Sequence, residues 1–135
     1  MNEIVAVGAE ITERHEINKD RTIGFMGEDC RVYSTPSMLY DMEIACRNLL
    51  LQHIEAGQDS VGTYAEINHT GPTLLGMWID ITATVTEVKG PAVKFEVVAR
   101  DALEQVATCK HARFVVGIES TKKRLMSKLD KFKAL

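Results

Sequence analysis

Apolar and polar residues alternate most clearly in the segment 77–88. Its apolar positions are Ile79, Ile81, Ala83 and Val85, and its polar positions are Asp80, Thr82, Thr84 and Thr86. Successive side chains of a strand point to opposite faces of a sheet, so this pattern predicts a half-buried strand. Segment 93–100 alternates in the same way after the turn residues Lys89, Gly90 and Pro91. The two segments are therefore expected to pair as an antiparallel hairpin.

Three further strands are predicted where β-branched and apolar residues gather, at 3–18, 61–70 and 105–118. The first alternates imperfectly, and the second ends at Gly71 and Pro72. The last four of the five strands are expected to follow one another in antiparallel succession.

One long helix is predicted from Thr35 and Pro36 to Gly57. Proline suits the first turn of a helix, the Thr35 hydroxyl before it can cap the first turn, and Gly57 can end the helix. Residues at three- and four-residue spacing form one broad, mainly apolar face: Met38, Met42, Ala45, Cys46, Leu49, Leu50 and His53. A short peripheral helix is expected at about 120–133.

The order of these elements predicts an α+β architecture. The 135 residues suit a single domain, and one helix followed by four antiparallel strands favours the hot-dog fold. In that fold a curved, antiparallel five-stranded sheet wraps around one long central helix. Segment 19–34 lacks a lasting period and is expected to be a lid-like loop. The uncovered edges of such a sheet favour a homodimer, and dimers could associate further.

Composition and charge argue against several kinds of partner, location and site. The net charge is −3, so a nucleic-acid partner is not expected. No apolar run is long enough to cross a membrane and the N-terminus does not resemble a signal peptide, so a cytoplasmic location is expected. Three widely spaced cysteines, Cys30, Cys46 and Cys109, favour reduced and mainly buried thiols over disulfides or a zinc site.

Glu43 is the first candidate for chemistry because it borders the apolar face of the long helix, in line with Leu39, Cys46 and Leu50. A carboxylate at that position either ends in water or is desolvated and serves as a general base. The helix pattern alone leaves both interpretations open.

His69 and Thr35 are the next candidates. His69 shares strand parity with Ala65 and Ile67, so it is predicted to face the helix, either as a hydrogen-bonded core residue or as a catalytic one. Thr35 is explained by capping, and its hydroxyl could also help to stabilise an oxyanion at the helix N-terminus. These two roles would compete for one oxygen atom.

Several other chemistries are not expected. His15, His53 and His111 lack a second ligand at metal-binding spacing, and the sequence contains no GxSxG, P-loop or GxGxxG motif. No metal or cofactor is therefore predicted. The basic residues of 120–135 are interpreted as a solvated face, with a phosphate-binding patch as the alternative.

The spacing of these residues resembles the fluoroacetyl-CoA thioesterase family of hot-dog proteins. Thr35 is followed by Glu43 eight residues later and by His69 after a further 26. The segments STPSMLYDMEIAC, INHTGPTLLG and KHARFVV carry the likeness, which runs from about Gly8 to about Ile118 and is gap-free between Thr35 and Arg113.

The resemblance implies a dimeric thioesterase that hydrolyses an acyl-CoA, with Thr35, Glu43 and His69 catalytic and with Gly76 and Arg113 binding substrate or CoA. The lid-like segment is similar in place but looks shorter, and it offers Phe25 and Tyr33 in place of the family's lid phenylalanines. Specificity for fluoroacetyl-CoA is therefore not expected, and a broader range of small acyl-CoAs, or another thioester, is the expected substrate. The alternatives are a hot-dog hydratase or dehydratase and a non-catalytic acyl-CoA-binding or sensory module.

Overall fold

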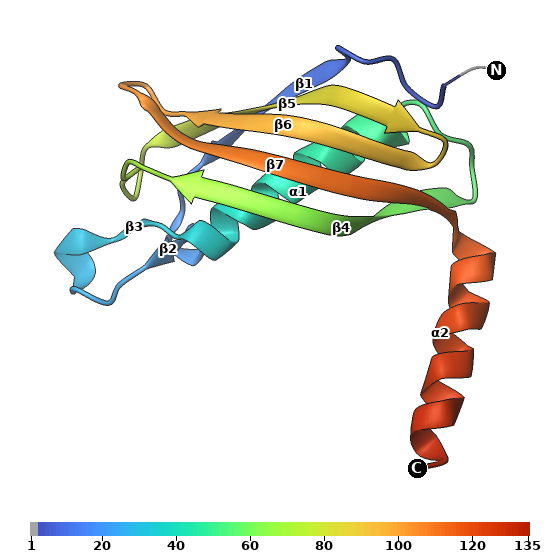
Figure 1. The fold of residues 1–135 in the computed structure, drawn as a ribbon. Coiled ribbons are helices and arrows are strands. Elements are labelled where there is room, and N and C mark those ends of the chain that lie inside the picture. Colours follow the sequence, from blue (N-terminus) through green and yellow to red (C-terminus); the bar gives the residue numbers. More distant parts are fainter. Residues whose placement is uncertain (1–2) are drawn as a thin grey trace.

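A single antiparallel sheet curves around one long helix in the computed structural model, which describes residues 3–135 (Figure 1). The sheet order is β1-β5-β6-β7-β4. The bounds are β1 Glu10–Glu16, α1 Thr35–Leu51, β4 Gln58–His69, β5 Trp78–Lys89, β6 Ala92–Arg100 and β7 Gln105–Gly117. The α+β class, the five strands and the long helix are therefore confirmed.

The order of the strands differs from the expected succession. β4 lies at one edge of the sheet and pairs with β7, from Gln58 opposite Gly117 to His69 opposite Ala107. β5 lies instead between β1 and β6, so the chain crosses the sheet after β4. The prediction that β4 and β5 are neighbours was wrong, because alternation fixes which face a side chain occupies and not which strand lies beside it. β4 is left with one unpaired edge.

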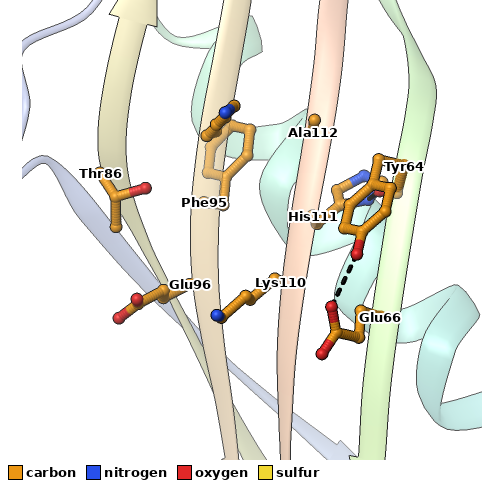
Figure 2. A pocket seen from close by; sticks show the side chains of 9 residues that line it. Tyr64, Glu66, Thr86, Phe95, Glu96, Lys110, His111 and Ala112 are labelled. Atoms are coloured by element: carbon orange, nitrogen blue, oxygen red, sulfur yellow. Dashed lines mark hydrogen bonds between the residues drawn. The ribbon is translucent and has the colours of Figure 1, made fainter.

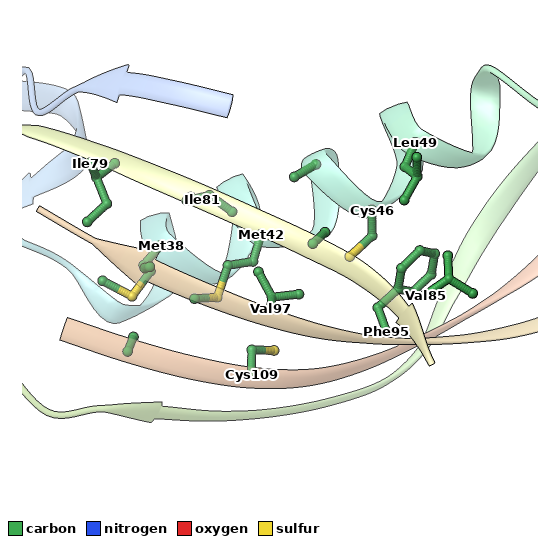
Figure 3. Packing of buried hydrophobic residues seen from close by; sticks show 14 of the residues in the cluster. Met38, Met42, Cys46, Leu49, Ile79, Ile81, Val85, Phe95, Val97 and Cys109 are labelled. Carbon is green, nitrogen blue, oxygen red and sulfur yellow. The ribbon is translucent and has the colours of Figure 1, made fainter. Parts of the chain in front are cut away.

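The core lies between α1 and the concave face of the sheet (Figure 3). Met38, Met42 and Cys46 of α1 are fully buried and face strands β5 and β6. The inward positions predicted for β5 are buried as well: Ile79, Ile81, Ala83 and Val85 are at most 1% exposed. Alternation along β5 and the period of the helix therefore placed the core correctly, except that His53, expected on the same helix face, lies beyond the end of α1 and is exposed.

Three element boundaries differ from those expected. β1 covers only part of 3–18. Its inward positions include Glu13 and His15, which bond to Asn48 and Arg21 and do not pack as apolar residues, and this accounts for the imperfect alternation of the segment. α1 ends at Leu51, so Gly57, with φ of +86°, belongs to the turn before β4 and not to the helix end. The C-terminal helix α2 spans Ile118–Lys133 and begins two residues earlier than predicted.

The lid-like segment is more regular than a loop. It contains the 3-10 turns Lys19–Arg21 and Glu28–Cys30 and the short strands β2 Thr22–Ile23 and β3 Val32–Tyr33, which pair with each other. Asp41 of α1 is buried and accepts hydrogen bonds from Tyr33 Oη at 2.5 Å and Arg21 Nε at 2.9 Å. Burial and the Asp41 carboxylate raise the pKa of Tyr33, which stays protonated and donates. This network ties the base of the segment to the helix.

Three further observations concern features expected from the sequence. No helix of residues 3–135 is both long and apolar enough to cross a membrane. Within the same residues no group of three or more His, Cys, Asp and Glu side chains is placed to hold a metal ion. Cys46 and Cys109 are buried free thiols and Cys30 is exposed.

Candidate functional site

Thr35 and His69 meet where the start of α1 reaches the end of β4. The Thr35 hydroxyl lies 2.8 Å from His69 Nδ1. Thr35 is not the helix cap: the preceding residue, Ser34, has the extended backbone of an N-cap, and its hydroxyl accepts a bond from Ser37 N at 3.2 Å. The capping prediction for Thr35 was wrong by one position. Because Ser34 caps α1, the Thr35 oxygen is free to bind His69, and the two roles do not compete.

Glu43 lies at a second place, against the first half of β4. A Cβ atom added to Gly62 would lie 2.9 Å from Glu43 Oε1, 3.3 Å from His111 Cε1 and 3.5 Å from Arg113 Nη1. A carboxylate, an imidazole and a guanidinium therefore converge on the space that Gly62 leaves open. Glycine within a strand often marks such a close approach.

A β-bulge places Gly62 on this face. The pairing of β4 with β7 shifts register between Gly62 and Tyr64, so Thr63 is the extra residue. His69 bonds to Thr35 on the helix side of the sheet, as its parity predicted, whereas strict alternation from His69 would turn Gly62 away from α1. The bulge restores it to the same side as Glu43.

Arg113 is only 6% exposed, and three hydrogen bonds hold its buried guanidinium group. Its Nε donates to Ser60 Oγ at 2.7 Å, its Nη2 to Ser60 O at 2.8 Å, and its Nη1 lies 3.2 Å from His111 Nε2. His111 Nδ1 is 2.7 Å from the Tyr64 carbonyl oxygen and must donate to it, so Nε2 accepts from Arg113. Burial lowers the pKa of His111, which favours this neutral form. Burial also lowers the pKa of Arg113, and the Glu43 carboxylate opposes that shift.

Within the single chain the candidate residues form two groups. Thr35 and His69 make one, and Glu43, Gly62 and Arg113 make the other. Thr35 and Glu43 are two turns apart on α1, a rise of about 12 Å. The Thr35 hydroxyl therefore does not contact the Glu43 carboxylate of its own chain. Each group includes a residue of β4, the strand at the edge of the sheet.

Gly76 lies apart from both groups. It precedes β5, its N–H donates to the Ile17 carbonyl at 2.8 Å, and a Cβ added there would meet nothing within 4 Å. Its φ of +91° gives a backbone reason for glycine. The structure thus does not bring Gly76 to Glu43.

Sequence reasoning missed Gly62, Ser60 and His111. A signal for His111 was present, because Cys109, His111, Arg113 and Val115 share one parity along β7 and all four are buried. Ser60 and Gly62 could not be placed by alternation, since the bulge inverts the parity of the strand before Thr63. The one sequence signal for them was the presence of a glycine within a strand.

A separate hollow lies on the face of the sheet away from α1 (Figure 2). It has a volume of about 580 Å³, and Tyr64, Glu66, Glu96 and Lys110 line it with five others. The Tyr64 hydroxyl donates to Glu66 Oε2 at 2.6 Å across its rim. None of the predicted catalytic residues borders this hollow. These candidates lie instead beside β4, the edge strand, where a carboxylate, a fixed cation and a threonine-bound histidine form a set of groups suited to acyl transfer.

The two glycines make a first test. In Gly62→Ala the added methyl group displaces the flexible end of Glu43, so we expect thioester hydrolysis to fall by tenfold or more, on the order of the loss from small displacements of reacting groups. Stability should change less than the rate, since the atoms that must shift are the ends of the Glu43 and His111 side chains and not backbone atoms. Gly76→Ala should do the opposite, costing about 1 kcal/mol of stability through its positive φ with little effect on the rate. Urea unfolding and initial rates of both variants measure the two effects.

The buried His111 makes stability depend on pH. Its pKa is lowered from the ordinary 6.5, so the neutral form stabilises the fold fully above that value, and the contribution is lost as the pH falls below it. We expect the free energy of unfolding to decline from pH 7.5 to 5.5 and the decline to be smaller in His111→Gln. Urea titrations at several pH values measure this, and His53→Gln, at an exposed position, is the matched control. An equal decline in His111→Gln would contradict the assignment.

Comparison with known proteins identifies the family of the chain. The family model described as fluoroacetyl-CoA-specific thioesterase matches residues 17–119. The fluoroacetyl-CoA thioesterase of Streptantibioticus cattleyicolor is 29% identical over 97 residues, covering 72% of this chain and 70% of that protein. A substituted fluoroacetyl-CoA thioesterase solved with acetyl-CoA has a TM-score of 0.84 at 24% identity, covering 92% of this chain and 98% of that one.

Two other solved structures match the fold along most of their length. A thioesterase superfamily member from Thermus thermophilus has a TM-score of 0.89 at 23% identity, with all of both chains covered. A hot-dog-like protein from Thermanaerovibrio acidaminovorans has a TM-score of 0.85 at 25% identity, with 93% of each chain covered. The sheet wrapped around α1 is thus the hot-dog fold, and the chain is a thioester hydrolase that belongs to the fluoroacetyl-CoA-specific thioesterase family.

Proposed function

We propose that this acyl-CoA thioesterase hydrolyses a small acyl-CoA to a carboxylate and free CoA. Glu43 either attacks the thioester carbonyl or activates a water molecule to attack it, and His69 and Thr35 assist. The observation that carries the proposal is the convergence of Glu43 and Arg113 on the open space at Gly62. A carboxylate beside a fixed cation can act at a carbonyl while the cation stabilises the developing oxyanion. The reaction needs only water, so no cofactor is invoked.

His69 suits the proton transfer in this scheme. Its Nδ1 is occupied by Thr35, which orients the ring and leaves Nε2 for the leaving thiolate. Within one chain Thr35 acts on His69 and not on Glu43, because the two helix residues are two turns apart.

The separation of the two groups favours a homodimer. An isologous dimer that pairs the free edges of β4 runs the two strands antiparallel, which places the partner's His69 at the Gln58 end of β4. That end carries Ser60 and Gly62, beside Glu43 and Arg113. Each site would then combine Glu43 of one protomer with the partner's His69.

The acyl group is proposed to be small. A shallow hollow of about 270 Å³ beside His69 is bordered by Val32, Tyr33 and Pro72, among others. Tyr33 is bound to Asp41 and is only 1% exposed, whereas Phe25 is 90% exposed, so these two aromatic residues do not close over the hollow together within one protomer. Selectivity for fluoroacetyl-CoA is therefore not part of the proposal. Acetyl-CoA is a reasonable first member of a panel, since a related thioesterase has been solved with it.

Substitutions at the site test the proposed roles. Glu43→Gln should lower the rate of free thiol release from acyl-CoA by about 10²–10⁴-fold, the usual contribution of a catalytic acid–base group. His69→Gln should also lower it, and Thr35→Val should do so without weakening the helix. Ser34→Ala should instead cost about 1 kcal/mol of stability through the lost cap, with the rate retained. Thiol release measured with a dye, together with urea unfolding, separates these effects.

Glu66→Gln is the control for Glu43→Gln, because Glu66 lies on the opposite face of the same sheet. Tight binding of acyl-CoA without thiol release from any member of the panel would overturn the proposal in favour of a binding module. Addition or loss of water across the acyl chain, with the thioester intact, would point to a hydratase or dehydratase.

A single turnover in oxygen-18 water distinguishes the two routes open to Glu43. If Glu43 forms a mixed anhydride with the acyl group, water that attacks its own carbonyl carbon leaves label in the side chain. If Glu43 activates water for direct attack, the label appears only in the released carboxylate. Mass spectrometry of the peptide containing Glu43 reads the outcome, and the same peptide from Glu43→Gln is the blank.

A further inference from the structure

Helix α2 presents a continuous apolar stripe that the rest of its own chain leaves uncovered. Leu125, Leu129 and Phe132 are 59%, 40% and 69% exposed and recur at helical spacing. No residue of α2 is buried. Scattered exposed apolar residues are common, but a stripe along one face of a helix marks an interaction surface.

The position of α2 shows which part of the sheet its apolar surface adjoins. It starts directly after Gly117, which pairs with Gln58 at the beginning of β4. Figure 1 shows α2 leaving the sheet on the side of β4 and running past that edge. A hollow of about 380 Å³ lies between them, lined by Val61, Leu125 and Met126 with six others. The apolar surface of α2 is therefore continuous with the free edge of the sheet.

Charge favours a second copy of the chain as the occupant of this surface. α2 contains six basic and two acidic residues, a net charge of +4. The whole chain carries −3, so the residues outside α2 together carry −7. None of the basic residues of α2 takes part in an ion pair among residues 3–135. A cationic helix projecting from an anionic body is attracted to the body of another copy.

The geometry of β4 identifies which part of the second copy α2 would contact. Antiparallel pairing of two β4 edges brings the start of one strand to the end of the other, and α2 follows the start. It therefore reaches the partner at the end of β4, where His69 and Thr35 lie. The turn that follows β4 exposes Leu74 and Leu75 at 50% and 44% and gives the stripe an apolar surface to cover.

We propose that α2 crosses to a second copy of this chain and packs beside that copy's Thr35–His69 pair, forming one wall of its active site. The inference rests on the proposed function for the location of the site. It assigns a role to the segment after residue 119, which the family match does not reach.

Mixing two impaired variants tests the crossing. The α2 variant carries Leu125→Gln, Leu129→Gln and Phe132→Gln, which remove the stripe but keep helix-forming residues and net charge. It should lose on the order of tenfold in kcat/KM, since losing apolar contacts of about 1.4 kcal/mol gives that factor. The second variant is His69→Gln. In a mixed dimer one site receives intact His69 from one chain and intact α2 from the other.

After the two variants are dissociated and reassociated in equal amounts, activity should rise to about a quarter of the wild-type value, because half the dimers are mixed and each has one intact site. Ser127→Gln, on the opposite face of α2, should match the wild type. An α2 variant that sediments as a monomer where the wild type is a dimer would also support the proposal. A dimeric α2 variant with full activity, or with no recovery on mixing, would overturn it, as would a monomeric wild type. Failure of the proposed function is distinct, since the wild type alone would then release no CoA.

Discussion

The burial of Arg113 is the constraint on which the site depends. A guanidinium cannot shed its charge and carries five N–H donors, so burying it requires acceptors arranged around it. Ser60 supplies two of them, a hydroxyl and a carbonyl, and His111 supplies the third. His111 Nε2 can accept because the ring proton sits on Nδ1, which donates a hydrogen bond to the Tyr64 carbonyl oxygen. Two adjacent strands, β4 and β7, thereby supply the acceptors for one cation. Glu43 faces that cation across Gly62.

Helix α1 links this constraint to the rest of the molecule. Its apolar face holds the concave side of the sheet through Met38, Met42 and Cys46. Its edge toward β4 carries Thr35 and Glu43, and Asp41 holds the lid-like segment through Tyr33 and Arg21. One helix therefore sets the position of the core, of both halves of the site and of the segment beside them. A displacement of α1 would alter all three together.

Local pattern predicted most of the fold and part of the site. Alternation along β5 and the helical period of α1 depend only on which face a side chain occupies, so Ile79, Ile81 and Met42 were placed from sequence. The position of β4 at the edge was not predicted, because strand order depends on how the chain crosses the sheet. Ser34 and Thr35 are both good caps, and the sequence offered no means to choose between them. His69 was placed correctly by parity, whereas Gly62 was hidden by a bulge that sequence alternation cannot register.

The bulge at Thr63, and not the number of residues in β4, decides which face the first half of that strand presents. Thr63 has no partner on β7, whereas Gly62 lies opposite Arg113 and Tyr64 opposite Ala112. Deleting Thr63 would leave both pairs in place and keep Ser60 and Gly62 on the side of α1. A strand that kept all of its residues but lost the bulge would instead turn every residue before Thr63 to the opposite face. Ser60 would then no longer bind Arg113, and the fold would survive without the site.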